Sequence, residues 1–186
     1  MELELKLESE LNAMVAITVV VISVFLGIIK LKDENIIQAM QHSQVQAVDL
    51  WNQYQAERIK LHGDENDAAA LTLRAGFGGA DPAAVNAEAK RLGTRIAHYQ
   101  TESAGLSKQA KGEEAQYQSL EYRHGQFDMA DALCSIALAL AAVAALASRR
   151  ALLFVAWGAG GFGLVMGIAG LAGWNVHPEW LANLLG

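Results

Sequence analysis

Apolar residues in this chain are concentrated in three long blocks that are separated by polar sequence. The blocks are residues 11–29, 132–148 and 151–174, and none of them contains an acidic or basic side chain. A helix needs about 20 apolar residues to cross the hydrocarbon core of a bilayer, so each block is predicted to be a transmembrane helix. The spanning segments are assigned to residues 11–32, 131–148 and 151–174, with a basic connection at residues 149–150.

The polar region after the first block carries a seven-residue repeat. One seam position is occupied by Val85, Leu92, Tyr99, Leu106, Glu113, Leu120 and Phe127, and the other by Ala89, Ile96, Ser103, Ala110, Tyr117, His124 and Asp131. Ten of these fourteen positions are apolar or aromatic, which is typical of a coiled-coil seam. Asp81 followed by Pro82 is a helix-start signal, so the second helix of this region is predicted over residues 83–130.

A weaker apolar stripe runs along residues 33–62, which are predicted to form the first helix of the polar region. The stripe consists of Ile37, Met40, Gln44, Ala47, Trp51, Tyr54 and Leu61. Gly63 is interpreted as the stop of this helix, Gly76, Gly78 and Gly79 mark a second stop, and residues 63–82 are interpreted as a Gly-rich turn region. Two helices that leave the same membrane face and are joined by a turn pack antiparallel. The fold class predicted is therefore an all-α membrane protein whose helices one and two are joined by a long antiparallel coiled-coil hairpin, here called the stalk.

Net charge and cysteine content narrow the classes of partner. The formal net charge is −6 and no basic stripe occurs, so nucleic acid is not expected to bind. The single cysteine, Cys134, lies inside the second apolar block and is interpreted as a packing residue. Residues 1–10 form an acidic tail, unlike the basic start of a cleavable signal peptide, so the first block is interpreted as a retained anchor. Residues 175–186 are predicted to form an interfacial C-terminal tail.

Two motifs resemble a known family. DLWNQYQAERIKLH at residues 49–62 is similar to the Trp-x-x-Tyr-Gln-Ala-x-x-Ile-Lys signature of the bacterial family called domain of unknown function 4337. QFDMADALCSIALALAAVAALASRR at residues 126–150 is similar to the Phe-Asp-x-Ala entry into the membrane and the basic hairpin of that family. The resemblance implies a multi-pass protein of the bacterial inner membrane and supplies no activity.

One polar cluster stands at the entry to the second membrane segment. Glu121, His124, Asp128 and Asp131 are spaced by three, four and three residues, so they share one helix face. Two interpretations are open: the cluster binds a divalent cation or passes a proton, or it is a hydrated face at the membrane boundary. The hydrated face is the favoured interpretation, and no cofactor is predicted. The other histidines, His42, His62, His98 and His177, share no metal-ligand spacing.

Small and aromatic residues suggest packing surfaces. Ala159, Gly163 and Gly167 recur every four residues, a spacing that lets helix backbones approach closely, either in a second copy or in helix two of the same chain. Seam residues expected at a packing surface are Leu92, Tyr99, Leu106 and Leu120. Interfacial anchors are expected at Trp157, Trp174 and Trp180. Trp51 and Tyr54 could cradle a cation, although packing against the second stalk helix is the favoured role.

Basic residues near the apolar blocks give conflicting signals on topology. Arg149 and Arg150 lie in a short connection, which predicts a cytoplasmic side for it and a periplasmic side for the stalk. Lys30 and Lys32 flank the first block on the stalk side and argue for the opposite orientation. The periplasmic stalk is favoured because arginines in short loops are the more reliable signal.

No catalytic pattern is present in the sequence. It has no Gly-Lys phosphate loop, no dinucleotide fingerprint and no nucleophile with a histidine partner. The favoured hypothesis is a non-enzymatic scaffold or assembly protein that forms homo-oligomers, with lipids, further copies and another membrane or envelope protein as candidate partners. The alternative hypothesis is an ion- or proton-coupling transport subunit that uses the cluster of Glu121, His124, Asp128 and Asp131.

Overall fold

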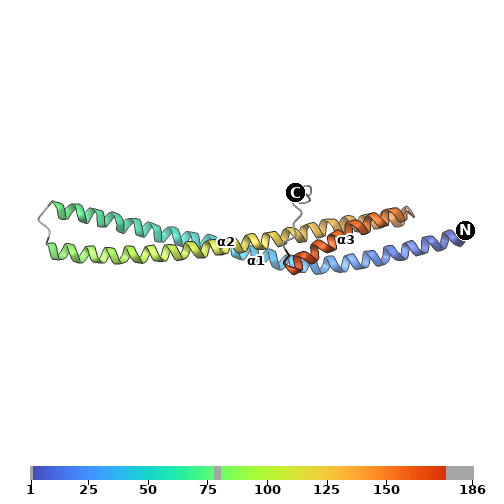
Figure 1. The fold of residues 1–186 in the computed structure, drawn as a ribbon, viewed down its shortest axis with the longest axis horizontal. Coiled ribbons are helices and arrows are strands. Elements are labelled where there is room, and N and C mark those ends of the chain that lie inside the picture. The colour runs from blue at the N-terminus through green and yellow to red at the C-terminus, as the bar shows by residue number, and fades with distance from the viewer. Residues whose placement is uncertain (1, 78–80, 175–186) are drawn as a thin grey trace. The chain divides into compact units, whose positions relative to one another are not determined.

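All elements of the structure are helices. The computed structural model describes residues 2–77 and 81–174, with side chains from residue 9 onward. Within this part of the chain it contains three helices and no strand: α1 (Glu2–Gly76), α2 (Pro82–Leu146) and α3 (Arg150–Ala172) (Figure 1). Each helix contains a stretch that is long and apolar enough to cross a membrane. The predicted all-α class is therefore confirmed.

The expected helix stop at Gly63 is wrong. Helix α1 continues through Gly63 and ends at Gly76, and it already begins at Glu2, inside the segment predicted as an acidic tail. A glycine inside a helix costs only about 1 kcal/mol relative to alanine. On either side of Gly63, Leu61 and Asp64 are buried, so packing outweighs that cost.

The start of α2 was predicted correctly. The Asp81 carboxylate accepts a hydrogen bond from the backbone N–H of Ala83 at 3.0 Å, and Pro82 occupies the first helical position. This is the usual arrangement of an N-cap residue followed by proline.

The chain divides into two compact units. Unit 1 comprises Met1–Met40 and Gln118–Gly186, and unit 2 comprises Gln41–Tyr117. Unit 2 holds the second half of α1 and the first half of α2, which run in opposite directions. Trp51 Nε1 donates to Glu114 Oε1 at 2.8 Å, and Asp64 pairs with Arg95 further along both helices.

The buried side of α1 in unit 2 follows an alternating spacing of four and three residues. All nine positions of this series are buried or half-buried: Ser43, Ala47, Leu50, Tyr54, Glu57, Leu61, Asp64, Ala68 and Leu71. The predicted stripe had Met40, Ala47, Tyr54 and Leu61 correctly placed. Ile37 and Trp51 are half-buried as well, but Gln44 is exposed and its neighbour Ser43 is buried in its place.

The buried side of α2 in unit 2 matches the predicted repeat almost throughout. Its buried residues are Leu92, Ser103, Leu106 and Ala110, and its half-buried ones include Val85, Ile96, Tyr99, Glu113 and Tyr117. Ala89 was expected in the seam but is exposed, and Glu88 is half-buried beside it. The Glu88 carboxylate pairs with Arg91 on the same helix at 2.6 Å.

Unit 1 is a bundle of three helical segments. Trp157 of α3 donates to Thr18 of α1 at 2.9 Å, and Arg150 pairs with Glu10 at 3.3 Å, so α3 runs parallel to α1. The α2 segment runs antiparallel to both. The apolar interior of unit 1 consists of three clusters, centred on Ala141, on Cys134 and on Phe127.

Glycines on α3 allow this close packing within the chain. A Cβ atom added at Gly163 would lie 2.8 Å from Sγ of Cys134 on α2. One added at Gly167 would lie 2.5 Å from Cδ1 of Ile29 on α1. The small-residue stripe is therefore occupied by the neighbouring helices of the same chain, which is one of the two uses expected for it.

The end of α3 is held by side chains of α2. Arg123 donates from Nε and Nη2 to the carbonyl oxygen of Gly170 at 3.3 and 3.2 Å. Gln126, which is fully buried, donates from Nε2 to the carbonyl oxygen of Trp174 at 2.7 Å. Gly173 ends the helix in the left-handed conformation with φ 69°. Positively charged donors at the carbonyl end of a helix stabilise its unsatisfied acceptors.

Candidate functional site

The candidate site is a cluster of three side chains at one end of the three-helix unit. Asp33 projects from α1, and His124 and Asp128 project from α2. His124 and Asp128 are four residues apart, so their side chains lie on the same helix face. Because α1 and α2 run in opposite directions, Asp33 meets them although it lies 91 residues from His124 in sequence.

Both ring nitrogens of His124 face a carboxylate. Nδ1 lies 2.6 Å from Oδ1 of Asp33, and Nε2 lies 3.4 Å from Oδ2 of Asp128. The first distance is that of a strong charge-assisted hydrogen bond, whereas the second is longer than the usual 2.7–2.9 Å of such a bond. His124 and Asp33 are 28% and 18% exposed at the side chain, while Asp128 is 65% exposed. The imidazole is therefore fixed firmly to α1 and loosely to its own helix.

The charges around His124 raise its pKa. Partial burial works in the opposite direction and is the largest single influence, since it disfavours the imidazolium. The hydrogen bond to Asp33 and the charges of Asp128, Asp33 and Glu121 together outweigh it, so the pKa lies above the ordinary value of 6.5. The cluster thus holds a proton more tightly than a solvated histidine does.

The pKa of Asp128 is also raised. Its main cause is desolvation by burial, which disfavours the carboxylate. His124 lowers the pKa, whereas the neighbouring charges of Asp33 and Asp131 raise it. The positions around His124 therefore carry an excess of negative charge, which a bound cation would reduce.

A cavity of about 220 Å³ adjoins the cluster. Four carboxylates line it, from Asp33, Glu34, Asp128 and Asp131, together with Lys30, Ile29 and Phe127. Nζ of Lys30 lies 3.6 Å from Oδ1 of Asp131. The lining thus combines four acidic groups with a single basic one, and this imbalance favours a positively charged occupant.

The structure brings together only part of the predicted polar cluster. His124 and Asp128 join the site, Asp131 lines the adjoining cavity and pairs there with Lys30, and Glu121 is exposed and helps to raise the pKa of His124 through its charge. Asp33 was missed. The signal for it was present, because the stripe of Met40, Ala47, Tyr54 and Leu61 extends back by seven residues to position 33. His124 was already assigned to the opposing seam.

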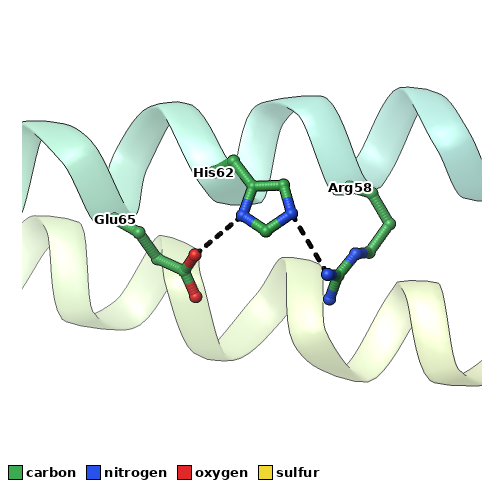
Figure 2. A network of polar contacts seen from close by, with 3 residues as sticks. All are labelled: Arg58, His62 and Glu65. Atoms are coloured by element: carbon green, nitrogen blue, oxygen red, sulfur yellow. Dashed lines mark hydrogen bonds and ion pairs between the residues drawn. The ribbon is translucent and has the colours of Figure 1, made fainter.

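His62 in unit 2 provides a comparison for His124, because its ring does not lie between two carboxylates. Figure 2 shows His62 between Glu65 and Arg58 on the same helix. Its Nδ1 lies 3.0 Å from the Glu65 carboxylate, while its Nε2 lies 3.1 Å from Nη2 of Arg58. A guanidinium beside one ring nitrogen excludes a second cation from that nitrogen. His62 is therefore an exposed hydrogen-bonding residue and a natural control for His124.

The predicted aromatic residues have packing and hydrogen-bonding roles in the described structure. Trp51 and Tyr54 stack edge to face with ring centroids 5.3 Å apart, and the Trp51 indole is bonded to Glu114 of α2. Trp157 and Trp174 are exposed on unit 1. Trp180 and His177 lie outside the described residues.

Comparison with known proteins assigns a family without assigning an activity. The family model described as Domain of unknown function (DUF4337) matches residues 11–173. The chain belongs to this family. The matched residues include all three helices from Leu11 of α1 to the end of α3 and therefore contain the whole Asp33–His124–Asp128 cluster. No curated protein and no solved structure matches the chain.

Proposed function

We propose that this member of the family is a non-enzymatic, homo-oligomeric membrane scaffold. In this proposal residues 11–32, 131–148 and 151–174, all in unit 1, span the bilayer, and unit 2 is an antiparallel coiled-coil hairpin that associates with further copies. The observation that carries the proposal is a second seven-residue repeat on α1 of unit 2, on the side that does not contact α2.

The inner seam of unit 2 is already satisfied within one chain. Leu61 of α1 and Leu92 and Leu106 of α2 are buried, and the Asp64–Arg95 ion pair closes one part of the seam. A surface for other copies must therefore lie elsewhere on these helices.

Large apolar side chains recur on the outer side of α1 at intervals of fourteen residues. Val45, Ile59 and Leu73 are 60%, 73% and 66% exposed. Asn52 and Asn66 occupy the intervening heptad positions and are also exposed. Apolar residues interrupted by asparagine in one heptad position are typical of coiled-coil interfaces, where the buried amide fixes register and partner number.

Small residues adjoin this outer series. Ala56, Gly63 and Ala70 are exposed and follow its members by four residues, again at intervals of seven. A Cβ atom added at Gly63 would meet nothing within 4 Å. The glycine is therefore not required by packing inside the chain, although it weakens the helix. Close approach of a helix from another copy accounts for it.

The outer series is suited to pairing with itself. Val45, Asn52, Ile59, Asn66 and Leu73 carry no charge, and in the adjoining series only Asp49, four residues after Val45, is charged. From Asn52 to Leu73, two copies that present these two series to one another therefore avoid like-charge repulsion. From Val45 to Leu73 the face is about 42 Å long at 1.5 Å per residue, which gives it the length of a substantial coiled coil.

Cysteine cross-linking in native membranes tests the proposal. Ile59→Cys in a Cys134→Ala background gives a disulfide-linked dimer under mild oxidation, because the same position of two copies meets along the seam. Thr101→Cys, on an exposed part of α2, is the matched control and gives little dimer. Ile59→Asp in otherwise unchanged protein dissociates the oligomer in mass photometry. A monomeric parent protein in detergent and no cross-link at Ile59 in membranes contradict the proposal.

For the cellular location, we propose the bacterial inner membrane with unit 2 on the periplasmic side. Support comes from the Arg150–Glu10 ion pair, since it groups the arginine connection with the start of the first apolar block at one end of unit 1. Short arginine-rich connections favour the cytoplasm. A cysteine at Ala68 that reacts with an impermeant thiol reagent in cells with a permeabilised outer membrane supports this orientation, and protection until the inner membrane is lysed reverses it.

The second candidate function is an ion- or proton-coupling subunit. It is favoured by one observation, the cavity lined by Asp33, Glu34, Asp128 and Asp131 at an end of the helices proposed to span the bilayer. In that case Asp131→Asn abolishes a cation- or pH-dependent flux into proteoliposomes while assembly is unchanged. In the scaffold function the same substitution leaves assembly and the cellular phenotype intact.

A further inference from the structure

We infer that His124 and Asp128 form a binding site for a divalent transition-metal ion of the zinc class, with Asp33 as the residue that orients the imidazole. The inference concerns unit 1 alone and does not depend on whether copies associate through unit 2.

The hydrogen bond to Asp33 fixes the protonation of the ring. Because Nδ1 lies 2.6 Å from Oδ1 of Asp33, it is the nitrogen that carries hydrogen and donates it. In a neutral imidazole the lone pair then lies on Nε2. A carboxylate that accepts the other N–H of a histidine is the usual support of a metal-bound imidazole, since it sets the ring orientation and increases its basicity.

The distance on the other side of the ring matches two donors on one metal. An unprotonated Nε2 and a carboxylate oxygen repel one another unless a cation lies between them. A proton in this place gives a hydrogen bond of about 2.7–2.9 Å. Two donors bound at about 2.0–2.2 Å with a tetrahedral angle between them lie about 3.4 Å apart. The separation of Nε2 from Oδ2 of Asp128 is 3.4 Å.

The surroundings provide room, charge and further oxygen ligands. The donor atoms of Asp33, His124 and Asp128 lie within 4.8 Å of one another. The adjoining cavity of about 220 Å³ also presents Glu34 and Asp131. Water molecules or these carboxylates complete the coordination, as in metal sites that keep open positions.

The donor set selects the class of metal. Imidazole nitrogen suits Zn²⁺ and its neighbours in the first transition row, whereas Ca²⁺ and Mg²⁺ prefer sites made of oxygen alone. Lys30 pairs with Asp131 at 3.6 Å, whereas the carboxylates that face the imidazole are those of Asp33 and Asp128. The negative charge nearest the imidazole is therefore left for the metal.

Titration of the full-length protein in detergent with Zn²⁺ and Co²⁺ tests the inference. After removal of metals with EDTA and dialysis, calorimetry should give one Zn²⁺ per chain. Co²⁺ should give the visible absorption of a four-coordinate site, which Zn²⁺ removes and an excess of Mg²⁺ or Ca²⁺ does not. Absence of saturable binding by folded protein overturns the inference.

Variants separate a metal site from a merely structural cluster. His124→Gln should abolish binding, Asp33→Asn should weaken it about 10- to 100-fold as expected for a residue that orients a ligand, and His62→Gln should leave it unchanged. Asp128→His, which keeps a metal donor but removes the carboxylate, should retain binding that Asp128→Asn loses. Equal binding by the parent protein and His124→Gln, or equal loss in Asp128→His and Asp128→Asn, contradicts the assignment.

Discussion

Asp64 of α1 and Arg95 of α2 form an ion pair across unit 2, with Nη2 of Arg95 at 2.8 Å from Oδ1 of Asp64. The Asp64 side chain is only 5% exposed, and it follows the helical glycine at position 63 directly. The pair therefore binds α1 to α2 at the point where the sequence pattern suggested that α1 ends.

Replacement of Arg95 by alanine should destabilise unit 2. The substitution leaves the buried Asp64 carboxylate without its partner, at a cost of about 1–3 kcal/mol. Thermal unfolding followed by circular dichroism should show a lower Tm. Arg91→Ala is the matched control, because the exposed Arg91 pairs with Glu88 of the same helix, both side chains are more than one third exposed, and such pairs contribute less than about 1 kcal/mol. Equal effects of the two substitutions contradict this interpretation of the Asp64 pair.

Gly163→Ala should destabilise unit 1. The new methyl group would lie 2.8 Å from Sγ of Cys134 and 3.2 Å from the carbonyl oxygen of Ala130, and overpacking of this kind costs about 1–3 kcal/mol. This exceeds the gain of about 0.5–1 kcal/mol from replacing a helical glycine. Gly161→Ala, on the open side of α3, should keep or raise the Tm. A Tm that falls only when the protein is oligomeric would instead place Gly163 between copies.

The stability of unit 1 should depend on pH through His124. The folded-state pKa of His124 is raised above 6.5, so its stabilising contribution is fully present below pH 6.5 and is lost as pH rises through the raised value. Measurements of Tm between pH 5 and 9, with EDTA present to exclude metal, should show this decline. His124→Gln should reduce the decline, whereas His62→Gln should preserve it.

Leu106→Asp should disrupt the pairing of the two helices in unit 2. Leu106 is buried in the seam, and an unpaired charge there costs several kcal/mol. The loss should appear as faster proteolysis of residues 41–117 and a lower Tm. Ala104→Asp, at a neighbouring exposed position of the same helix, is the control.

Asp131→Asn should change the Tm much less than Leu106→Asp does. The Asp131 carboxylate pairs with Lys30, and both side chains are more than one third exposed, so the pair contributes at most about 1 kcal/mol. A large loss of stability in Asp131→Asn together with tolerance of Leu106→Asp would contradict the assignment of the seam as the main support of unit 2.

The helical repeat of α2 could be predicted from the sequence because most of its buried positions are occupied by apolar residues. Leu92, Leu106 and Phe127 occupy the same position of the seven-residue repeat, and all three are buried. The stripe on α1 was harder to place, because small and polar residues such as Ser43 and Asp64 are buried there while Val45 and Ile59 are exposed. The predicted stripe therefore included the exposed Gln44 and left out the buried Ser43 and Asp64.

Only the part of the candidate site that lies on α2 could be predicted from the sequence. His124 and Asp128 lie on one helix, so their proximity follows from a spacing of four. Asp33 joins them through the register between two antiparallel helices, which depends on all the contacts along their length. The sequence places Asp33 in the seven-residue series of α1. It does not predict which residue of α2 Asp33 contacts.

The matched repeats on α1 and α2 restrict how the length of unit 2 can vary. An insertion of one residue after Ala47 would rotate every later side chain of α1 by about 100° and turn Leu61 and Asp64 away from α2. Seven residues added to α1 and seven to α2 at the facing point would leave both seams intact. Differences in the length of this unit between members of the family should therefore come in paired steps of seven residues, with a reach that changes by about 10 Å for each step.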